Sequence, residues 1–261
     1  MRIVVLAKPV PDPASSAERL GPDNRLDRSA APAVINGNDE YALEAALKLT
    51  EAHGGEVIVL AMAPASAPEM LRKALAMGAA SGVLVTDPAL EGADTLTSAR
   101  VLAAALRGME YDLVMAGVDT SDGGAGVVPA GVATLLGLPY LSYAAKVEPD
   151  PSAGTVRVQR ISPTGFDVLE ASMPAFVSGT QALGAPRYPS LKGIMAARSK
   201  EIATRSLADL ELGDKAPSGT WTTRVLASEP PAARAPTRVV RAPADEAAKE
   251  IVDLLASRGI V

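Results

Sequence analysis

The amino-acid sequence predicts an α/β fold built on a doubly wound parallel sheet. Apolar runs rich in β-branched and aliphatic residues recur in the first half, at residues 3–6, 57–62, 82–86 and 113–116. Segments with helical periodicity alternate with them, at residues 39–51, 68–77 and 95–107. This alternation is typical of βαβ units whose strands are buried on both faces. Because such crossovers are right-handed, the helices are expected to cover both faces of the sheet.

The pattern changes after residue 139, where strand-like segments follow one another without helices. They lie at residues 144–148, 155–161 and 166–172, joined by the turns PDPSAG and SPTG. We expect a small antiparallel addition here, closed by an apolar run at residues 174–178. From residue 182 onward, prolines and charged residues become frequent and apolar runs become rare. We expect an extended segment at residues 230–243 and a helix at 245–256. The predicted division is a domain over residues 1–185 and an extended C-terminal arm over 186–261, which would wrap its own domain or a partner.

The composition excludes several kinds of site. No cysteine is present, which rules out disulfides and thiolate metal sites, and the single histidine, His53, rules out a His-rich metal site. We expect His53 to be exposed at the end of a helix. The net charge of -5 argues against nucleic acid as a partner. No apolar run approaches the ~20 residues of a membrane span, and no signal peptide is visible, so we expect a cytoplasmic protein without a membrane span.

The most informative stretch covers residues 117–131 and reads GVDTSDGGAGVVPAG. It follows a strand-like run and precedes an apolar segment, residues 127–136, that is expected to be helical. Strand, glycine-rich turn and helix together can hold a phosphate on free backbone N–H groups. The stretch is neither a Walker A motif nor a GxGxxG fingerprint, so a tight turn without function is an equally good interpretation of this loop alone. A site is favoured because the loops at residues 7–13 and 61–67 would share its sheet edge.

Several stretches, taken in order, resemble those of a known family. They read VVLAKPVPD from residue 4, NGNDEYALEA from residue 36, LRKALAMGA from residue 71 and TSDGG from residue 120. The most specific reads PRYPSLKGIMAAR and covers residues 186–198. Together they resemble the β subunit of electron transfer flavoprotein, the FixA-type bacterial homologues included. The resemblance covers nearly the whole chain.

The resemblance implies a Rossmann-like fold of the adenine-nucleotide-binding type and a role in a heterodimer with a larger α subunit, which the arm would wrap. The pair would carry one FAD, held mainly by the α subunit. It would take electrons from dehydrogenases of the acyl-CoA dehydrogenase type, as in fatty acid β-oxidation, and pass them to a quinone oxidoreductase. The chain would be an electron carrier without catalytic residues. Its own site would bind AMP structurally or, as in electron-bifurcating relatives, a second FAD.

The nucleotide site implied by the resemblance draws on four stretches of the chain. Its residues are Ala7; Asn36, Gly37, Asn38 and Asp39; Met62; and Gly117, Asp119, Thr120, Ser121, Asp122, Gly123, Gly124, Ala125, Gly126, Val127 and Val128. Backbone groups of Ala7 and Met62 would face adenine, and either Asn36 or Asn38 would cap the following helix. The N–H groups of residues 123–128 would hold the phosphate. Asp122 would contact ribose or a local turn, since its charge repels phosphate. The family often carries Gln or Asn-Gln-Thr at residues 126–128, so side-chain donors to phosphate are missing here.

The resemblance also implies that residues 186–198 grip partner dehydrogenases. The residues involved would be Tyr188, Leu191, Lys192, Ile194, Met195 and Arg198. Leu191 would be an exposed anchor, while Ile194 and Met195 would pack against the protein. The basic residues at 187, 192, 198, 200 and 205 would form either a solvated face or a surface that steers an acidic partner.

Two other protein classes share the predicted fold. A nucleotide-binding stress-protein-like module usually carries Gly-x-x-Gly followed by Gly-Ser or Gly-Thr, which the glycine-rich loop lacks, and it has no region like that after Pro186. An ATP-cleaving synthetase would need Ser-Gly-Gly-x-Asp-Ser after the first strand, where this chain reads AKPVPD. The choice between AMP and FAD stays open.

Overall fold

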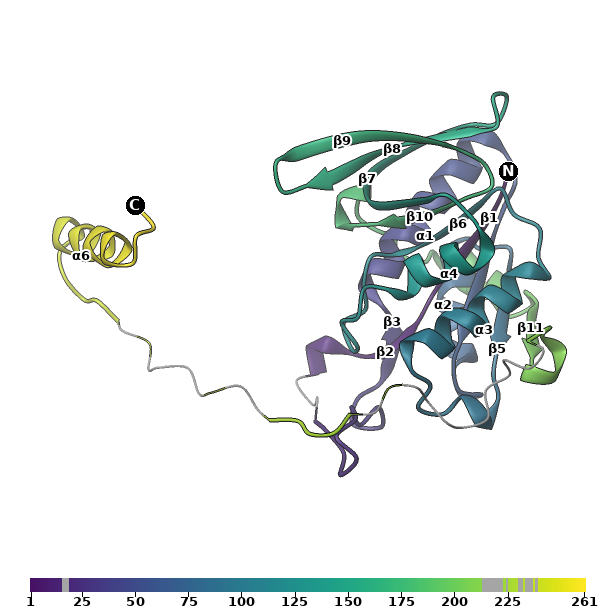
Figure 1. The fold of residues 1–261 in the computed structure, drawn as a ribbon, viewed down its shortest axis with the longest axis horizontal. Helices are drawn as coiled ribbons and strands as arrows, with labels where there is room; N and C mark the ends of the chain where they lie inside the picture. Colours follow the sequence, from purple (N-terminus) through teal and green to yellow (C-terminus); the bar gives the residue numbers. More distant parts are fainter. Residues whose placement is uncertain (16–18, 213–222, 224, 230–231, 233–236, 238) are drawn as a thin grey trace. The chain divides into compact units, whose positions relative to one another are not determined.

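A nine-stranded sheet runs through residues Met1–Leu226, the first of two compact units into which the chain divides (Figure 1). The computed structural model describes all residues except 16–18, 213–222, 224, 230–231, 233–236 and 238. From one edge to the other, the strands are β11 (Ile202–Arg205), β5 (Ser81–Val85), β4 (Glu56–Met62), β1 (Arg2–Leu6), β6 (Leu113–Gly117), β10 (Ala175–Gly179), β7 (Tyr140–Asp150), β8 (Thr155–Ser162) and β9 (Gly165–Ser172).

The sheet is parallel from β11 to β7 and antiparallel from β7 to β9. This confirms the predicted doubly wound sheet with an antiparallel addition. One expectation was wrong: the apolar run at residues 174–178 does not close the antiparallel region. It forms β10, which lies between β6 and β7 in the parallel part. All five residues of β10 are buried, as expected for a strand covered on both faces.

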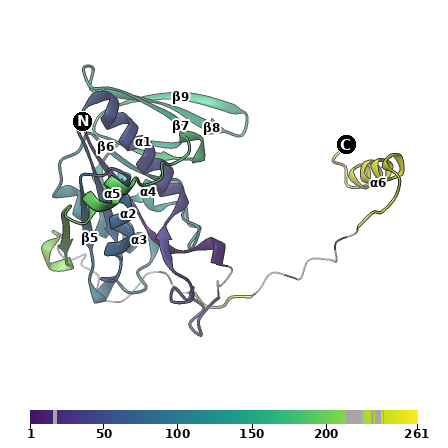
Figure 2. The ribbon, with the colours of Figure 1, turned by 180° about the vertical axis from the view of Figure 1, so that it is seen from behind.

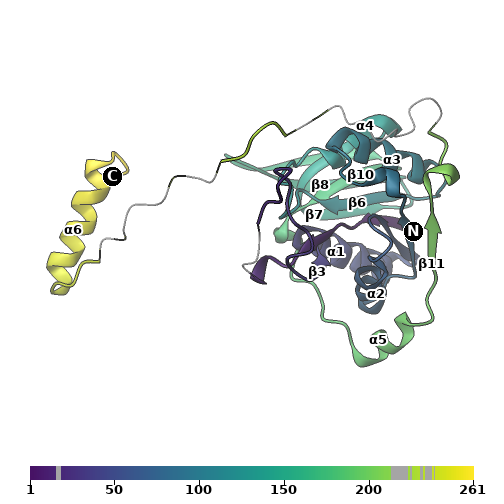
Figure 3. The same ribbon diagram turned by 90° about the horizontal axis from the view of Figure 1, so that it is seen from below.

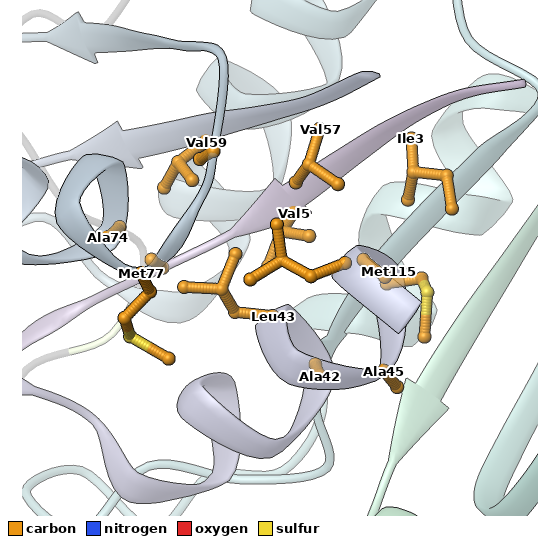
Figure 4. Close-up of a cluster of buried hydrophobic side chains, with 14 of the residues drawn as sticks. Ile3, Val5, Ala42, Leu43, Ala45, Val57, Val59, Ala74, Met77 and Met115 are labelled. Carbon is orange, nitrogen blue, oxygen red and sulfur yellow. The ribbon is translucent and has the colours of Figure 1, made fainter. Parts of the chain in front are cut away.

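Helices cover both faces of the parallel part (Figure 3). One face carries α1 (Gly37–His53), α2 (Pro68–Met77) and the short α5 (Leu191–Ala197), and the other carries α3 (Thr95–Arg107) and α4 (Val128–Leu136). Alternate residues of β1, β4, β5, β6 and β10 enter different hydrophobic clusters. Ile3 and Val5 pack with Leu43 of α1 in one cluster (Figure 4), and Val4 packs with Leu102 of α3 in the other.

The predicted helices at residues 68–77 and 95–107 match α2 and α3 residue for residue. In both helices, buried apolar residues recur at helical spacing on one face and polar residues occupy the other. Asp94 caps α3 by accepting the N–H of Thr97. Three strands were not expected. A short antiparallel pair, β2 (Pro9–Pro11) and β3 (Ala33–Ile35), follows β1, and β11 adds an edge strand beside β5, beyond residue 185. All three escape prediction because strands of three or four residues, one containing two prolines, carry almost no periodic signal.

The second unit, Ala227–Val261, contains α6 (Ala244–Ser257). The helix extends one residue beyond the predicted span at each end. Its sequence is amphipathic, with Ile251, Val252, Leu254 and Leu255 on one face. Half of the extended segment expected at residues 230–243 lies outside the described residues. No described helix is both long and apolar enough to cross a membrane.

Candidate functional site

The chain reverses its direction of travel across the sheet at β1. It moves from β1 outward through β4 to β5 and then returns to β6 on the other side of β1. A reversal of this kind leaves a crevice outside the carboxyl ends of the two central strands, where ligands of open α/β sheets bind. Two predicted stretches meet there, because α1 begins and the glycine-rich loop after β6 leaves the sheet at the same place.

Asp39 joins the two sides of this crevice. It lies in the first turn of α1 and is buried, with Oδ1 accepting the N–H of Gly117 at 2.9 Å and Oδ2 accepting the N–H of Lys8 at 2.9 Å. Burial raises the pKa of Asp39 to about 7, against the opposing effect of the two N–H donors. Asp39 therefore holds the ends of β1 and β6 together, and both its oxygens are already used by the protein.

Asn36 and Asn38 bind the glycine-rich loop. The amide of Asn36 donates to the carbonyl of Asp119 at 2.8 Å and accepts the N–H of Ser121 at 3.2 Å. Asn38 donates to the same carbonyl at 3.1 Å. The expectation that one of them caps the helix with its side chain was wrong: Asn36 occupies the N-cap position but makes no side-chain capping bond. Bonding the opposite loop satisfies its buried amide instead.

The glycine-rich loop closes on itself through Asp119. Its Oδ1 accepts the N–H groups of Thr120 at 2.7 Å and Gly126 at 3.0 Å. Gly124 and Gly126 adopt φ of 56° and 62°, the left-handed region that favours glycine. Within the described residues, the N–H groups of Ala125 and Val127 have no protein acceptor. Only part of the loop is thus available to hold an anion through its backbone.

A cation pair flanks the loop. Asp122, whose side chain is fully enclosed, lies 2.9 Å from Nζ of Lys8 and 2.5 Å from Nη2 of Arg28. Burial alone would raise the pKa of Asp122, but Lys8 and, to a smaller extent, Arg28 lower it to about 2. Neither basic residue was predicted for the site. Lys8 could have been found from its place directly after β1, whereas Arg28 lies in a segment without periodicity.

A pocket of about 300 Å³ opens between α1 and the loop. Its lining residues are Pro13, Asn36, Gly37, Asn38, Tyr41, Asp119, Thr120 and Ser121. The other predicted site residues lie outside this lining. Ala7 is buried, and its N–H donates to the carbonyl of Leu60 at 3.0 Å; Met62 ends β4, and residues 122–128 continue the loop into α4. Tyr41, one helical turn after Gly37, was missed although its spacing on α1 places it on the same face.

The predicted partner-recognition residues lie on α5 or flank it, with Tyr188 before the helix and Arg198 directly after it, and α5 packs against α2 (Figure 2). Tyr188 is 95% exposed and Leu191 77% exposed. The expectation that Ile194 and Met195 pack against the protein was wrong, because both are exposed. Small residues face α2 instead, with Ala197 buried and Gly193 so close that a Cβ would lie 2.3 Å from the carbonyl oxygen of Ala76.

Leu191, Ile194 and Met195 are exposed and lie three or four residues apart or adjacent on α5, and the exposed Tyr188 precedes the helix; we call these four apolar residues the α5 patch. The basic residues expected to cluster around the patch do not all remain free, because the protein itself engages some of them. Arg187 pairs with Glu44 and Glu51, and the ammonium of Lys200 donates to the carbonyls of Leu75 and Ala79. In the described part of the chain, Lys192 and Arg198 lie exposed beside the patch without an acidic partner.

Comparison with known proteins identifies the family. The model of the electron transfer flavoprotein domain matches residues 23–210. The electron transfer flavoprotein subunit beta of Thermoanaerobacterium thermosaccharolyticum is 36% identical over all of both chains, and that of Mycobacterium tuberculosis is 38% identical over 99% of each. Protein FixA of Azorhizobium caulinodans is 39% identical over 82% of this chain and 78% of its own. The chain therefore belongs to the electron transfer flavoprotein family, a family of electron carriers, and matches its β subunits along the whole of its length.

Proposed function

We propose that the chain is the β subunit of a heterodimeric electron transfer flavoprotein. With an α subunit it carries electrons from dehydrogenases of the acyl-CoA dehydrogenase type to a quinone oxidoreductase, through an FAD held mainly by the α subunit. The observation that carries this proposal is the full-length match to β subunits at 36–38% identity. The exposed α5 patch and the amphipathic α6 give the chain surfaces suited to partners.

We further propose that the crevice between α1 and the glycine-rich loop binds AMP. A pocket of about 300 Å³ lies at the lower end of the range for small-molecule sites, which favours a mononucleotide over a second FAD. Tyr41 offers an aromatic wall for a base or ribose. Lys8 and Arg28 share the single carboxylate of Asp122, so the three side chains keep one net positive charge. This charge and the free N–H groups of Ala125 and Val127 would supply the positive potential that a phosphate requires.

Substitution of Gly124 by valine should lower the AMP content of the purified protein. Gly124 has φ of 56°, which a β-branched residue rarely adopts, so Gly124→Val should distort the loop. Gly154→Val is the matched control, because Gly154 has φ of 67° and equally open surroundings in the β7–β8 turn, away from the crevice. Nucleotide released on denaturation should fall several-fold in the first variant alone. Equal AMP contents in the two variants would contradict the assignment of this loop.

Substitution of Leu191 should weaken partner binding without destabilising the fold. Because the side chain is 77% exposed, Leu191→Ala should leave the melting temperature nearly unchanged, whereas a buried leucine costs ~2–5 kcal/mol. Loss of an anchor costs about 2 kcal/mol of binding, so KM for an acyl-CoA dehydrogenase donor should rise roughly 30-fold. Leu96→Ala, at an exposed leucine on the other face of the sheet, is the control. Normal donor kinetics for Leu191→Ala would exclude the α5 patch as the recognition surface.

A further inference from the structure

The helix that carries the α5 patch cannot be held in place by its own stability. It has seven residues, and isolated helices of this length are unstable in water. Ser190 caps it by accepting the N–H of Gly193 at 3.0 Å, but Ala197 is its only buried residue. The orientation of its exposed side chains must therefore be fixed by contacts outside the helix.

Arg187, four residues before the first residue of α5, supplies the strongest of these contacts. Its guanidinium lies against Glu44 with Nε to Oε2 at 2.8 Å and against Glu51 with Nη1 to Oε1 at 2.5 Å and Nη2 to Oε2 at 3.0 Å. Its backbone N–H also donates to Glu44 at 3.1 Å. The two carboxylates are seven residues apart on α1 and share one face of it. The side chain of Glu44 is 3% exposed, whereas that of Arg187 is 32% and that of Glu51 is 57% exposed, so the Arg187–Glu44 pair is shielded from water and the Arg187–Glu51 pair faces solvent.

The electrostatic effects agree with a strong cluster. Burial opposes ionisation of Glu44, yet the contacts with Arg187 are enough to lower its pKa below the ordinary value. The hydrogen bond from Arg187 lowers the pKa of Glu51 as well, and the two carboxylates raise the pKa of Arg187. The contacts are charge-assisted and multidentate, so they are strong and also restrict the orientation of the guanidinium relative to the two carboxylates.

Two contacts with α2 secure the other side of the helix. The guanidinium of Arg72 donates to the carbonyls of Ala197 at 2.7 Å and Lys200 at 2.6 Å. Gly193 rests directly on the carbonyl of Ala76, where a side chain would not fit. The helix is thus attached to α1 before its first residue and to α2 along its body and beyond its end.

We propose that Arg187 is a positioning residue for partner recognition, which fixes the entry to α5 on α1 and so presents the α5 patch in one preset orientation. The inference rests on the proposed function, in which this patch binds the dehydrogenase. A surface that is ordered before binding loses less conformational entropy on association. Arg187 itself need not touch the partner. Glu44 and Glu51 share the role, and lysine cannot replace Arg187, because an ammonium lacks the planar fork that meets two carboxylates.

The test uses the complete heterodimer with its FAD, and compares Arg187→Gln with Arg157→Gln. Arg157 also forms a guanidinium–carboxylate pair, with Glu170, but on β8 and β9, away from α5. Hydrogen exchange of the amides of residues 190–198 should accelerate about tenfold in Arg187→Gln and stay unchanged in the control. KM for the dehydrogenase donor should rise, with FAD content and kcat unchanged. Arg187→Lys should restore the slow exchange only in part.

Glu51→Gln provides a second variant that leaves no buried charge unpaired, and it should accelerate the same amides by a smaller factor. Unchanged exchange at residues 190–198 in both Arg187→Gln and Glu51→Gln would overturn the proposal, whatever the donor kinetics. Accelerated exchange with an unchanged KM would also overturn it, provided that Leu191→Ala raises KM. If Leu191→Ala leaves KM unchanged, the recognition role of the patch fails instead, which is a failure of the proposed function.

Discussion

Gly117→Ala should be strongly destabilising, although it adds a single methyl group. A Cβ at this position would lie 2.5 Å from Cβ of Asn38, 2.6 Å from its carbonyl carbon and 2.8 Å from Oδ1 of Asp39. Two of these atoms, Cβ and the carbonyl carbon of Asn38, belong to the first turn of α1. They cannot move away from Gly117 without breaking the hydrogen bond between Asp39 and Gly117. Overpacking of this kind costs ~3 kcal/mol or more, which for a protein of this size lowers the melting temperature by roughly 5–12 °C.

Gly123→Ala is the matched control for this prediction. Gly123 lies in the same loop, but its added Cβ would meet nothing closer than 3.7 Å. Calorimetry of the two variants should therefore show a large fall for Gly117→Ala and almost none for Gly123→Ala. Equal melting temperatures would contradict the close approach of β6 to α1.

Asp39→Asn should make the stability of the protein depend less on pH. Burial raises the pKa of Asp39 in the folded protein from 3.8 to about 7, so folding favours its protonated form. The stability that protonation contributes is complete below pH 3.8 and is lost as the pH rises toward 7. Between pH 5 and pH 8 the wild type should lose ~2–3 kcal/mol that the variant does not lose.

Asparagine offers one acceptor where the site presents two N–H donors, so the variant should be less stable than the wild type at pH 5. Its deficit should then shrink as the pH rises. Urea unfolding at pH 5, 6, 7 and 8 measures this difference, in which the groups common to both proteins cancel. A deficit that is constant or grows with pH would mean that Asp39 is ionised throughout this range.

The sequence predicts the layered architecture well, because the apolar strands and amphipathic helices of the first half are regular. The spans of α2 and α3 follow directly from their periodicity. The place of β10 was not predictable in the same way. Its run AFVSG is as compatible with closing an antiparallel meander as with entering the parallel sheet, and only long-range pairing with β6 decides between them.

The sequence predicted which segments form the site more accurately than it predicted which hydrogen bonds their side chains make. The sequence and the family resemblance bring together α1 and the glycine-rich loop, and the structure places them side by side. Sequence patterns do not show that Asn36 bonds the loop instead of capping its helix, because both roles need the same amide. On α5, the larger residues Ile194 and Met195 were expected to be buried, but Gly193 and Ala197 allow close approach to α2 and turn the larger side chains outward.

The central claim, that this chain is one half of a flavin-carrying heterodimer, is tested most directly by the flavin content with and without an α subunit. The chain should be expressed alone and together with the α subunit, purified, and examined by absorption spectroscopy and by mass determination of the ligands released on denaturation. The chain alone should be nearly colourless, and the complex with the α subunit should be stable and contain one FAD and one AMP. A stoichiometric flavin spectrum from the isolated chain, or no complex with the α subunit, would contradict it.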